Sequence, residues 1–282
     1  MGENIIKNIP PKYTKYVRRL KTCATSICNV VVDKNGECKV VFGDMKIHNE
    51  ISFPEVCKNK NLKNAPIIVM DANIAKETMK RVLETSKEYK IPVFYEPSDM
   101  RIADKPFTLG SIFTDQIKFI SPNIFELQAI SKSIKGESMD FLNTKILENK
   151  EETMQVAKKL LNDVNGNFDC VILTLGSFGV IVSGPLDIQH TFFDNDLIYK
   201  GKPDTLIKNF YFEAPKIHNI INVSGAGDSF CSGFISAMLK RDTLKNCVLN
   251  GFSGAKDALL SEDAVPEHYT LVAENLKYYE IF

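Results

Sequence analysis

Several patterns are missing from this 282-residue sequence, and each missing pattern argues against a class of protein. The seven cysteines are odd in number, widely spaced and without a Cys-x-x-Cys pair, which argues against a disulfide framework and a zinc site. The four histidines also lie far apart and form no metal-ligand pair. This cysteine usage predicts reduced thiols and therefore an intracellular protein.

An excess of one charge and a long apolar run are missing as well. Lys plus Arg and Asp plus Glu each number 35, so the chain lacks the basic excess that is typical of nucleic-acid binders. No stretch reaches 18 consecutive apolar residues, and the N-terminus has no apolar signal-peptide core. We therefore expect a soluble cytoplasmic protein that binds neither nucleic acid nor membranes.

The first fifty residues divide into a polar arm and a hairpin. Residues 1–21 are polar, contain a Pro-Pro pair and are expected to form an irregular arm, whereas residues 22–282 are expected to form one domain. Two apolar runs flank residues 33–37, which contain Asn-Gly, and Asn-Gly between such runs indicates a β-hairpin because both residues tolerate positive φ. Residues 22–50 are therefore predicted to form a small β-element.

From about residue 65, short apolar runs alternate with segments of helical periodicity. This alternation predicts an α/β fold with a doubly wound, mostly parallel sheet that is covered on both faces. Residues 184–211 are polar and predicted to be mixed and turn-rich. Strands are predicted at 67–70, 92–96, 118–120, 170–174 and 180–182, and helices at 75–89, 124–134, 151–161, 225–239 and 244–260.

The predicted sheet selects candidate ligand-binding positions before any motif is considered. In a doubly wound sheet, ligands bind beyond the carboxyl ends of the parallel strands. The residues that follow those strands are therefore candidates for a site. They are Asp71 and Asn73, residues 96–99, residues 121–123, residues 174–177 and the turn before Gly225.

The strongest chemical signal is the run of small residues before Asp228. Gly225, Ala226 and Gly227 would let the backbone turn sharply into a helix, whose unpaired N–H groups and dipole form an anion site. Asp228 falls in the first turn, where a carboxylate can accept a proton from a substrate hydroxyl as it attacks phosphorus. The alternative is an ordinary helix cap, which is the usual role of Ser or Asp near a helix start.

The segment 222–234 resembles the C-terminal signature of the ribokinase-like (PfkB) carbohydrate kinase family, roughly Asp-Thr-x-Gly-Ala-Gly-Asp-x-Phe. The match at 225–228 and at Phe230 is complete. The resemblance implies a ribokinase-like fold with the hairpin as a lid, ATP as phosphate donor, Asp228 as catalytic base and the Gly-Ala-Gly amides as anion hole. Asn222 stands where many members have Asp, at a position thought to support a monovalent-cation loop, so potassium is left open as a cofactor.

Further motifs fit the same resemblance. Asn123 and Glu126 match the family's Asn-x-x-Glu motif, which implies a role in holding Mg²⁺ and phosphates, directly or through water. The two residues would share one helix face, and a capped helix start with a surface Glu is the alternative. A turn that resembles the family's ATP-lining Thr-x-Gly-x-x-Gly turn and a helix of small residues that resembles the one beside the adenine contribute Thr174, Gly176, Gly179 and Asn250. An ordinary strand-turn-strand is the alternative for the turn.

Four further segments, in their order along the chain, resemble the pseudouridine kinase branch of the family. They imply phosphorylation of the 5′-hydroxyl of pseudouridine, and a sugar or nucleoside substrate more broadly. Family members usually begin with a further segment that carries a sugar-binding Asp and a Gly-Gly pair, and this sequence contains no Gly-Gly. The segments are 33–37, 43–48, 93–99 and 264–267.

The missing Gly-Gly pair leaves two classes of function open. An N-terminally truncated kinase with an incomplete sugar site is the first, and a non-catalytic nucleotide- or partner-binding protein is the second. A Rossmann dehydrogenase is disfavoured because its Gly-x-Gly motif should follow the first strand, whereas here it lies near the end of the chain. A homodimer is also left open.

Overall fold

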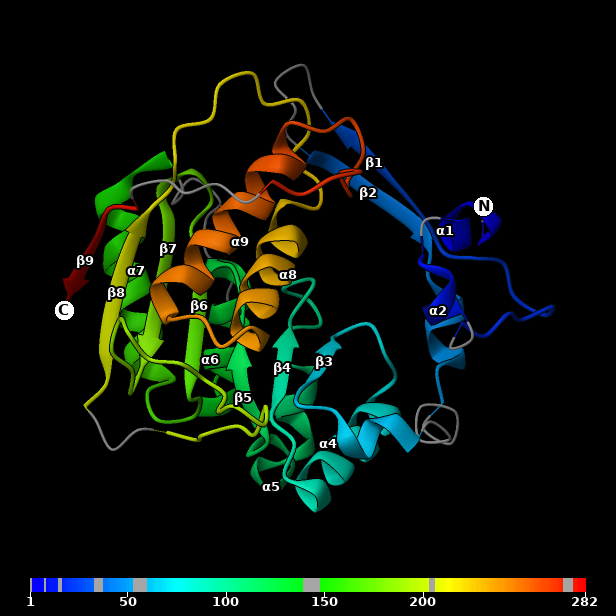
Figure 1. The fold of residues 1–282 in the computed structure, drawn as a ribbon, viewed down its shortest axis with the longest axis horizontal. Coiled ribbons are helices and arrows are strands. Elements are labelled where there is room, and N and C mark those ends of the chain that lie inside the picture. The colour runs from blue at the N-terminus through cyan, green and yellow to red at the C-terminus, as the bar shows by residue number, and fades with distance from the viewer. Residues whose placement is uncertain are drawn as a thin grey trace.

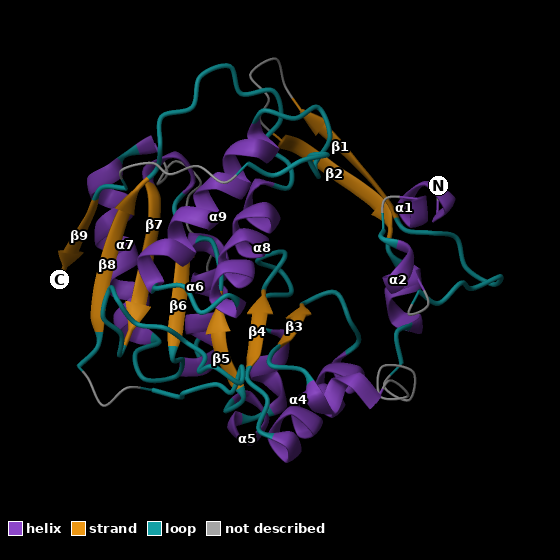
Figure 2. Cartoon of the chain, viewed as in Figure 1, coloured by secondary structure: helices purple, strands orange, loops and turns teal. Residues whose placement is uncertain are grey.

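A computed structural model of the chain describes residues 2–7, 9–14, 17–32, 38–52, 60–138, 148–202, 206–270 and 276–282. The body is a seven-stranded sheet with helices in front of it and behind it, and a two-stranded hairpin stands beside this body (Figures 1 and 2). The predicted α/β fold with a mostly parallel sheet and a hairpin near the N-terminus is confirmed.

The strands follow one another across the sheet in chain order, from β3 to β9. The first four are parallel and the remaining pairings are antiparallel. The carboxyl ends of the parallel strands therefore lie along one edge of the sheet. The strands are β3 (Ile68–Asp71), β4 (Val93–Glu96), β5 (Ile117–Ile120), β6 (Cys170–Thr174), β7 (Gly179–Gly184), β8 (Lys208–Glu213) and β9 (Tyr278–Ile281).

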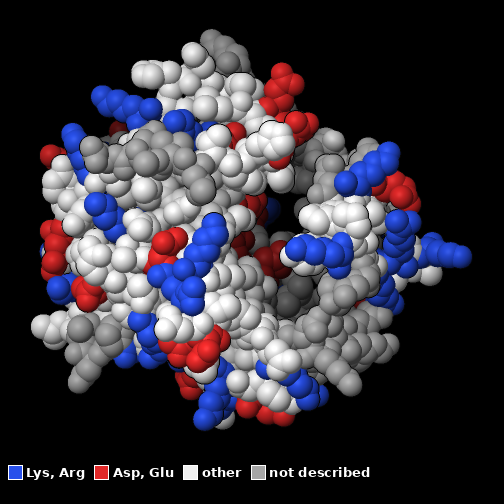
Figure 3. All heavy atoms as spheres, viewed as in Figure 1, with Lys and Arg blue, Asp and Glu red and all other residues white. Residues whose placement is uncertain are grey.

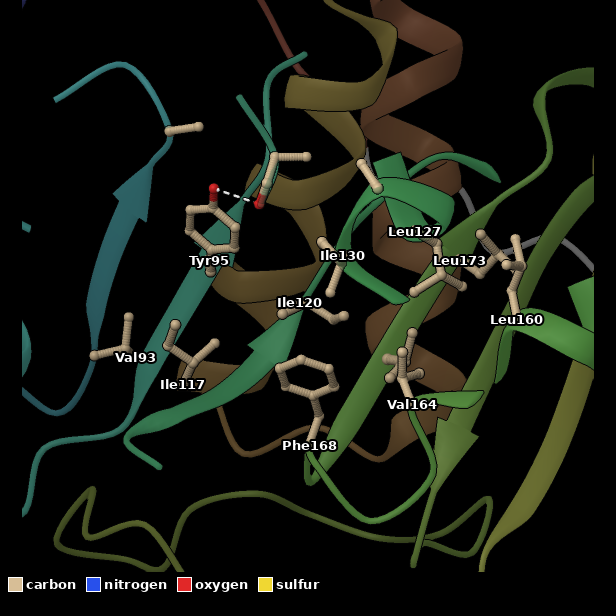
Figure 4. Packing of buried hydrophobic residues seen from close by; sticks show 14 of the residues in the cluster. Val93, Tyr95, Ile117, Ile120, Leu127, Ile130, Leu160, Val164, Phe168 and Leu173 are labelled. Carbon is tan, nitrogen blue, oxygen red and sulfur yellow. Dashed lines mark hydrogen bonds between the residues drawn. The ribbon is translucent and has the colours of Figure 1, made fainter. Parts of the chain in front are cut away.

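Two hydrophobic cores, one on each face, explain why the central strands carry apolar side chains on both faces. One core packs α4 (Lys76–Tyr89), α6 (Ile124–Lys135) and α7 (Lys150–Asp163) on the sheet, and Figure 4 shows part of it around Tyr95 and Ile130. The other packs α8 (Ala226–Leu239) and α9 (Leu244–Leu259) on the opposite face.

Helices α8 and α9 approach each other closely because glycines lie between them. A Cβ on Gly233 would lie 2.3 Å from the carbonyl oxygen of Asn250, and one on Gly254 would lie 2.4 Å from that of Ser229. A larger residue at either position would push the two helices apart. This packing fixes the start of α8 relative to the sheet.

The N-terminal segments differ in part from the prediction. β1 (Ile27–Val32) and β2 (Cys38–Asp44) form the predicted antiparallel hairpin, while its predicted Asn-Gly turn lies outside the described residues. The arm contains two short helices, α1 (Gly2–Lys7) and α2 (Pro11–Thr14), where we predicted irregular structure.

Strands β8 and β9 and several short helices were not predicted. β8 begins within the segment that we predicted to be turn-rich, and its pairing with β7 runs from Gly179–Glu213 to Gly184–Lys208. The short helices are η1 (Lys46–Glu50), η2 (Lys60–Asn64), η3 (Lys105–Leu109), α5 (Ser111–Thr114) and η5 (Gly176–Phe178). No helix in the described ranges is long and apolar enough to cross a membrane.

Candidate active site

Helix α8 begins without a side-chain cap. Its N-cap residue is Gly225, whereas the side chains of Asn123, Asn149 and Thr243 accept hydrogen bonds from the first turns of α6, α7 and α9. Gly225 has φ 77°, and a Cβ there would lie 2.1 Å from the carbonyl oxygen of Ala264. Only glycine fits this turn, which leaves the first N–H groups of α8 available to a ligand.

Asn222 holds the turn that precedes α8. Its Oδ1 accepts a hydrogen bond from the backbone N–H of Ser224 at 2.9 Å, and its Nδ2 donates to the carbonyl oxygen of Glu262 at 3.3 Å. The residue that departs from the family signature therefore ties this turn to residues 261–264. Both the oxygen and the nitrogen of the Asn222 side chain therefore take part in hydrogen bonds to the backbone.

A cavity of about 630 Å³ opens beside the start of α8. Ala226 and Gly227 line it, and a Cβ on Gly227 would meet no atom within 4 Å, so the backbone faces open space there. Apolar side chains from α8, α9 and residues 217–223 line the rest. The complete lining is Thr174, Gly176, Ser177, Gly179, Val180, Ala214, Pro215, Lys216, Ile217, His218, Ile220, Val223, Ala226, Gly227, Phe230, Phe252, Ala255 and Leu259.

The structure brings most of the predicted nucleotide residues to this cavity. Thr174, Gly176 and Gly179, at the β6–β7 turn, line it together with Ala226 and Gly227 from the start of α8. Gly179 has φ 114° and a Cβ there would lie 2.1 Å from the carbonyl oxygen of Phe212, so the turn requires glycine. Asn250 is not part of the lining; its Nδ2 donates to the carbonyl oxygen of Asn246 in the same helix.

A second cavity, of about 450 Å³, lies at the carboxyl ends of β3 and β4 and is lined by Asp228. Figure 3 shows a hollow between the body and the N-terminal segments, with Asp and Glu atoms on its wall. The strand-end rule identified several of its residues, whereas the side chains from α8 other than Asp228 were not predicted. The lining is Val69, Asp71, Asn73, Phe94, Glu96, Ser98, Asp228, Cys231, Ser232 and Ile235.

Polar side chains connect the two strand ends in this second cavity. The Nδ2 of Asn73 donates to Asp71 Oδ2 at 3.1 Å and to Ser98 Oγ at 3.3 Å, and Ser98 Oγ donates to Glu96 Oε2 at 2.9 Å. Burial raises the pKa of Glu96, hydrogen bonds from Ser98 oppose this rise, and the carboxylates of Asp228 and Asp71 add to it. Asp228 and Glu96 are therefore close enough to interact electrostatically.

The predicted pair Asn123 and Glu126 forms a capping box at the start of α6. Asn123 Oδ1 accepts from the N–H groups of Phe125 and Glu126 at 2.9 and 3.0 Å, and Glu126 Oε2 accepts from the N–H of Asn123 at 2.8 Å. The helix cap that we considered as an alternative is thus present. Glu126 is nevertheless buried rather than at the surface.

Burial and neighbouring carboxylates make Glu126 unusual. Burial raises its pKa to about 7, the hydrogen bond from Asn123 opposes the rise, and Glu96, Asp99 and Asp228 add to it. A nearby cation would offset this repulsion. Among the described residues, no group of three or more His, Cys, Asp or Glu side chains could hold a metal ion.

The unpredicted lining residues of α8 follow helical spacing. Cys231, Ser232 and Ile235 come three, four and seven positions after Asp228, which places all of them on one face of the helix. Cys231 is buried, its Sγ donates to Ser121 Oγ at 3.1 Å, and burial raises its pKa to about 12. The periodicity of this helix was the signal that could have identified these side chains.

Comparisons with known proteins identify the family of the chain. Residues 13–256 match the family described as pfkB family carbohydrate kinase. Pseudouridine kinase from Arabidopsis thaliana is 23% identical in an alignment that covers 91% of this chain and 74% of that protein. Pseudouridine kinase from Escherichia coli (strain K12) is 25% identical over 211 residues, which cover 73% of this chain but only 53% of that protein.

The fold is also found among solved structures. Arabidopsis thaliana ribokinase complexed with ribose and ATP superimposes with a TM-score of 0.56 at 18% sequence identity. The match covers 86% of this chain and 66% of the ribokinase chain. At this identity the similarity concerns the arrangement of the elements, which is ribokinase-like.

Proposed function

Because the chain belongs to the pfkB family of carbohydrate kinases, we propose that it transfers the terminal phosphoryl group of ATP to a hydroxyl of an uncharged nucleoside or sugar. One observation carries the proposal: consecutive residues at the start of α8 line two different cavities. Gly227 faces the larger cavity and Asp228 the smaller one. A phosphate in the first would therefore lie next to a hydroxyl in the second.

The larger cavity suits a nucleotide. Its apolar walls can cover a base, and its volume of about 630 Å³ lies within the usual range for small-molecule sites. The uncapped N–H groups of residues 226–228 and the dipole of α8 favour a phosphate at its inner end. The same amides would stabilise negative charge on the phosphoryl group during transfer.

The smaller cavity suits an uncharged acceptor. Three carboxylates line it, and its lining contains no Lys or Arg among the residues that the structure describes. A sugar that already carries a phosphate would be repelled there, whereas hydroxyl groups could donate to these carboxylates. Asp228 would accept the proton of the attacking hydroxyl. The relatives named pseudouridine kinase favour pseudouridine. The β1–β2 hairpin, which stands beside the body in Figure 1, would serve as a lid.

Magnesium would complete the charge balance of this site. Bound with ATP, it would neutralise phosphate oxygens and lower the repulsion from the acidic side chains. Glu126 would act on it through water, because Asn123 Oδ1 and Glu126 Oε2 already accept backbone hydrogen bonds. The two hydrogen bonds of the capping box hold the carboxylate of Glu126 in one position before any ligand binds.

The proposal is tested by measuring ATP consumption with Mg²⁺ and four acceptors: pseudouridine, uridine, ribose and fructose 6-phosphate. We expect turnover with an uncharged acceptor, most of all pseudouridine, and none with fructose 6-phosphate. The Asp228→Asn variant is the control for contaminating kinases. ATP binding by calorimetry without turnover on any acceptor would instead support the non-catalytic alternative.

A further inference from the structure

A separate cavity of about 350 Å³ opens at the opposite end of the parallel strands from Asp228. Residues that precede β4, β5 and β6 line it, together with residues at the end of α4 and in the segment 199–202. It shares no lining residue with the two cavities described above. The lining is Lys90, Pro92, Gln116, Lys118, Asp169, Tyr199, Gly201 and Lys202.

One carboxylate in this cavity is already neutralised. Asp169 is 3% exposed; its Oδ2 accepts a hydrogen bond from the hydroxyl of Tyr199 at 2.5 Å, and its Oδ1 lies 3.4 Å from Lys202 Nζ. Lys202 Nζ also donates to the carbonyl oxygen of Gly166 at 3.1 Å. These contacts hold Asp169, Tyr199 and Lys202 together as one wall of the cavity. The ring of Tyr199 also packs edge-to-face against the ring of Phe119.

Positive charge remains after this pairing. Lysines from three separate segments line the cavity against the single carboxylate of Asp169, which gives a net charge of +2. The ammonium groups of Lys90 and Lys118 make no hydrogen bond or ion pair within the described part of the chain. A dianion would balance this charge, and a phosphate ester carries between about 1.5 and 2 negative charges at neutral pH.

Lys90 occupies a backbone conformation that does not suit it. It ends α4 in the left-handed region, with φ 55° and ψ 38°, where glycine is the usual residue because a Cβ is disfavoured there. A lysine at this position contributes a positive charge to the lining of the cavity, but its left-handed backbone makes the end of α4 less stable than a glycine would. An unfavourable residue of this kind is a reason to look for a function.

We propose that this cavity binds a small phosphate ester, such as a sugar phosphate, through the ammonium groups of Lys90 and Lys118. The volume exceeds that of a phosphate group, so a sugar-sized portion of the ligand would contact Pro92 and Tyr199. The site lies at the opposite end of the parallel strands from the proposed reaction centre, and ligand binding there does not depend on phosphoryl transfer. Its ligand would therefore be an effector rather than a substrate.

The chain contains no tryptophan, so the tryptophan fluorescence of a variant with one introduced tryptophan comes from that position alone. We would titrate the Gln116→Trp variant with ribose 5-phosphate, inorganic phosphate and uncharged ribose and follow its fluorescence. We expect a saturable change with ribose 5-phosphate, a weaker affinity for inorganic phosphate and no change with ribose. Adding Lys118→Met should raise the apparent Kd at least about tenfold, the usual effect of losing one charged contact.

Matched variants separate this site from others. Lys87→Met removes an exposed charge on α4 outside the cavity, and Gly227→Val alters the proposed ATP site; neither should change the titration. An equal response to ribose, or an unchanged Kd in the Lys118→Met variant, would overturn the proposal.

A second measurement follows the thermal unfolding of a Lys90 variant and needs no introduced tryptophan. Lys90→Gly should raise the midpoint of thermal unfolding by about 2–4 °C, because it relieves the left-handed backbone. The same variant should lose most of the further rise that ribose 5-phosphate produces in the parent protein. Opposite effects on stability and on ligand response exclude a purely structural role. A ligand-induced rise equal to that of the parent protein would contradict a role for Lys90 in binding.

Discussion

Gly227 and Asp228 are consecutive residues in the first turn of α8, yet each lines a different cavity. The helix rotates successive side chains by about 100°, so the backbone of one residue faces one cavity and the carboxylate of the next faces the other. Reactants bound in the two cavities would meet at this turn. Holding reactants together in this way contributes a large part of the rate enhancement of enzymes.

Asp228→Asn tests the proposed general base. We expect turnover to fall at least about a hundredfold, the usual scale for losing general-base catalysis, with ATP binding and unfolding temperature unchanged. Asp242→Asn, in the turn that follows the same helix, is the matched control and should keep full turnover. Near-normal turnover of Asp228→Asn would show that another group accepts the proton.

Two glycines at the start of α8 should respond differently to substitution. Gly227→Val introduces a side chain into open space, so we expect lost ATP binding with little loss of stability. Gly225→Ala forces a side chain into a left-handed backbone and against Ala264, so we expect destabilisation by more than about 1 kcal/mol. Calorimetric ATP binding and urea unfolding distinguish the two effects. Equal loss of stability in both variants would argue against an anion site at Gly227.

The buried carboxyl of Glu126 should make stability depend on pH. Its pKa of about 7 lies above the ordinary value of 4.5, so between these values the folded state binds more protons than the unfolded state. Stability should therefore fall as pH rises through this window and level off above it. We expect Glu126→Gln to be more stable than the parent at pH 8, by on the order of 1–3 kcal/mol, and similar to it at pH 4.5.

Urea unfolding of both proteins without Mg²⁺ at the two pH values measures this difference. The exposed Glu88→Gln variant is the control and should follow the parent at both values. A constant difference between Glu126→Gln and the parent at all pH values would mean that folding does not change the pKa of this carboxyl.

Lys105 supports the loop that carries Asp71 and Asn73. Its Nζ donates to the carbonyl oxygens of Ala72 at 2.5 Å and Ile74 at 3.1 Å, and burial lowers its pKa. Lys105→Met removes both hydrogen bonds, so we expect the KM for the acceptor to rise at least about tenfold while the KM for ATP stays unchanged. Steady-state kinetics with each substrate varied measures this split. A parallel rise in both KM values would indicate general unfolding of the site.

The elements that were predicted correctly are those with strong local patterns. β6 has the predicted bounds because four consecutive apolar residues, Cys170 to Leu173, favour a buried strand, and α8 and α9 agree with the prediction within one residue. β8 and β9 were missed because their pairing with β7 and with each other depends on residues far apart in the sequence. The start of α8 was predictable because its small residues permit a backbone that few others allow.

The sequence by itself determined the alternation of strands and helices, the Gly-Ala-Gly-Asp turn and the strand ends where ligands could bind, because each depends on residues that are close in the chain. Only the tertiary structure decided which of these residues meet. It showed that Asn123 and Glu126 form a helix cap and that this Glu is buried near Asp228. It also placed Asn250 outside the nucleotide cavity, because the direction of a side chain on a packed helix is set by the neighbouring helix and not by the local sequence.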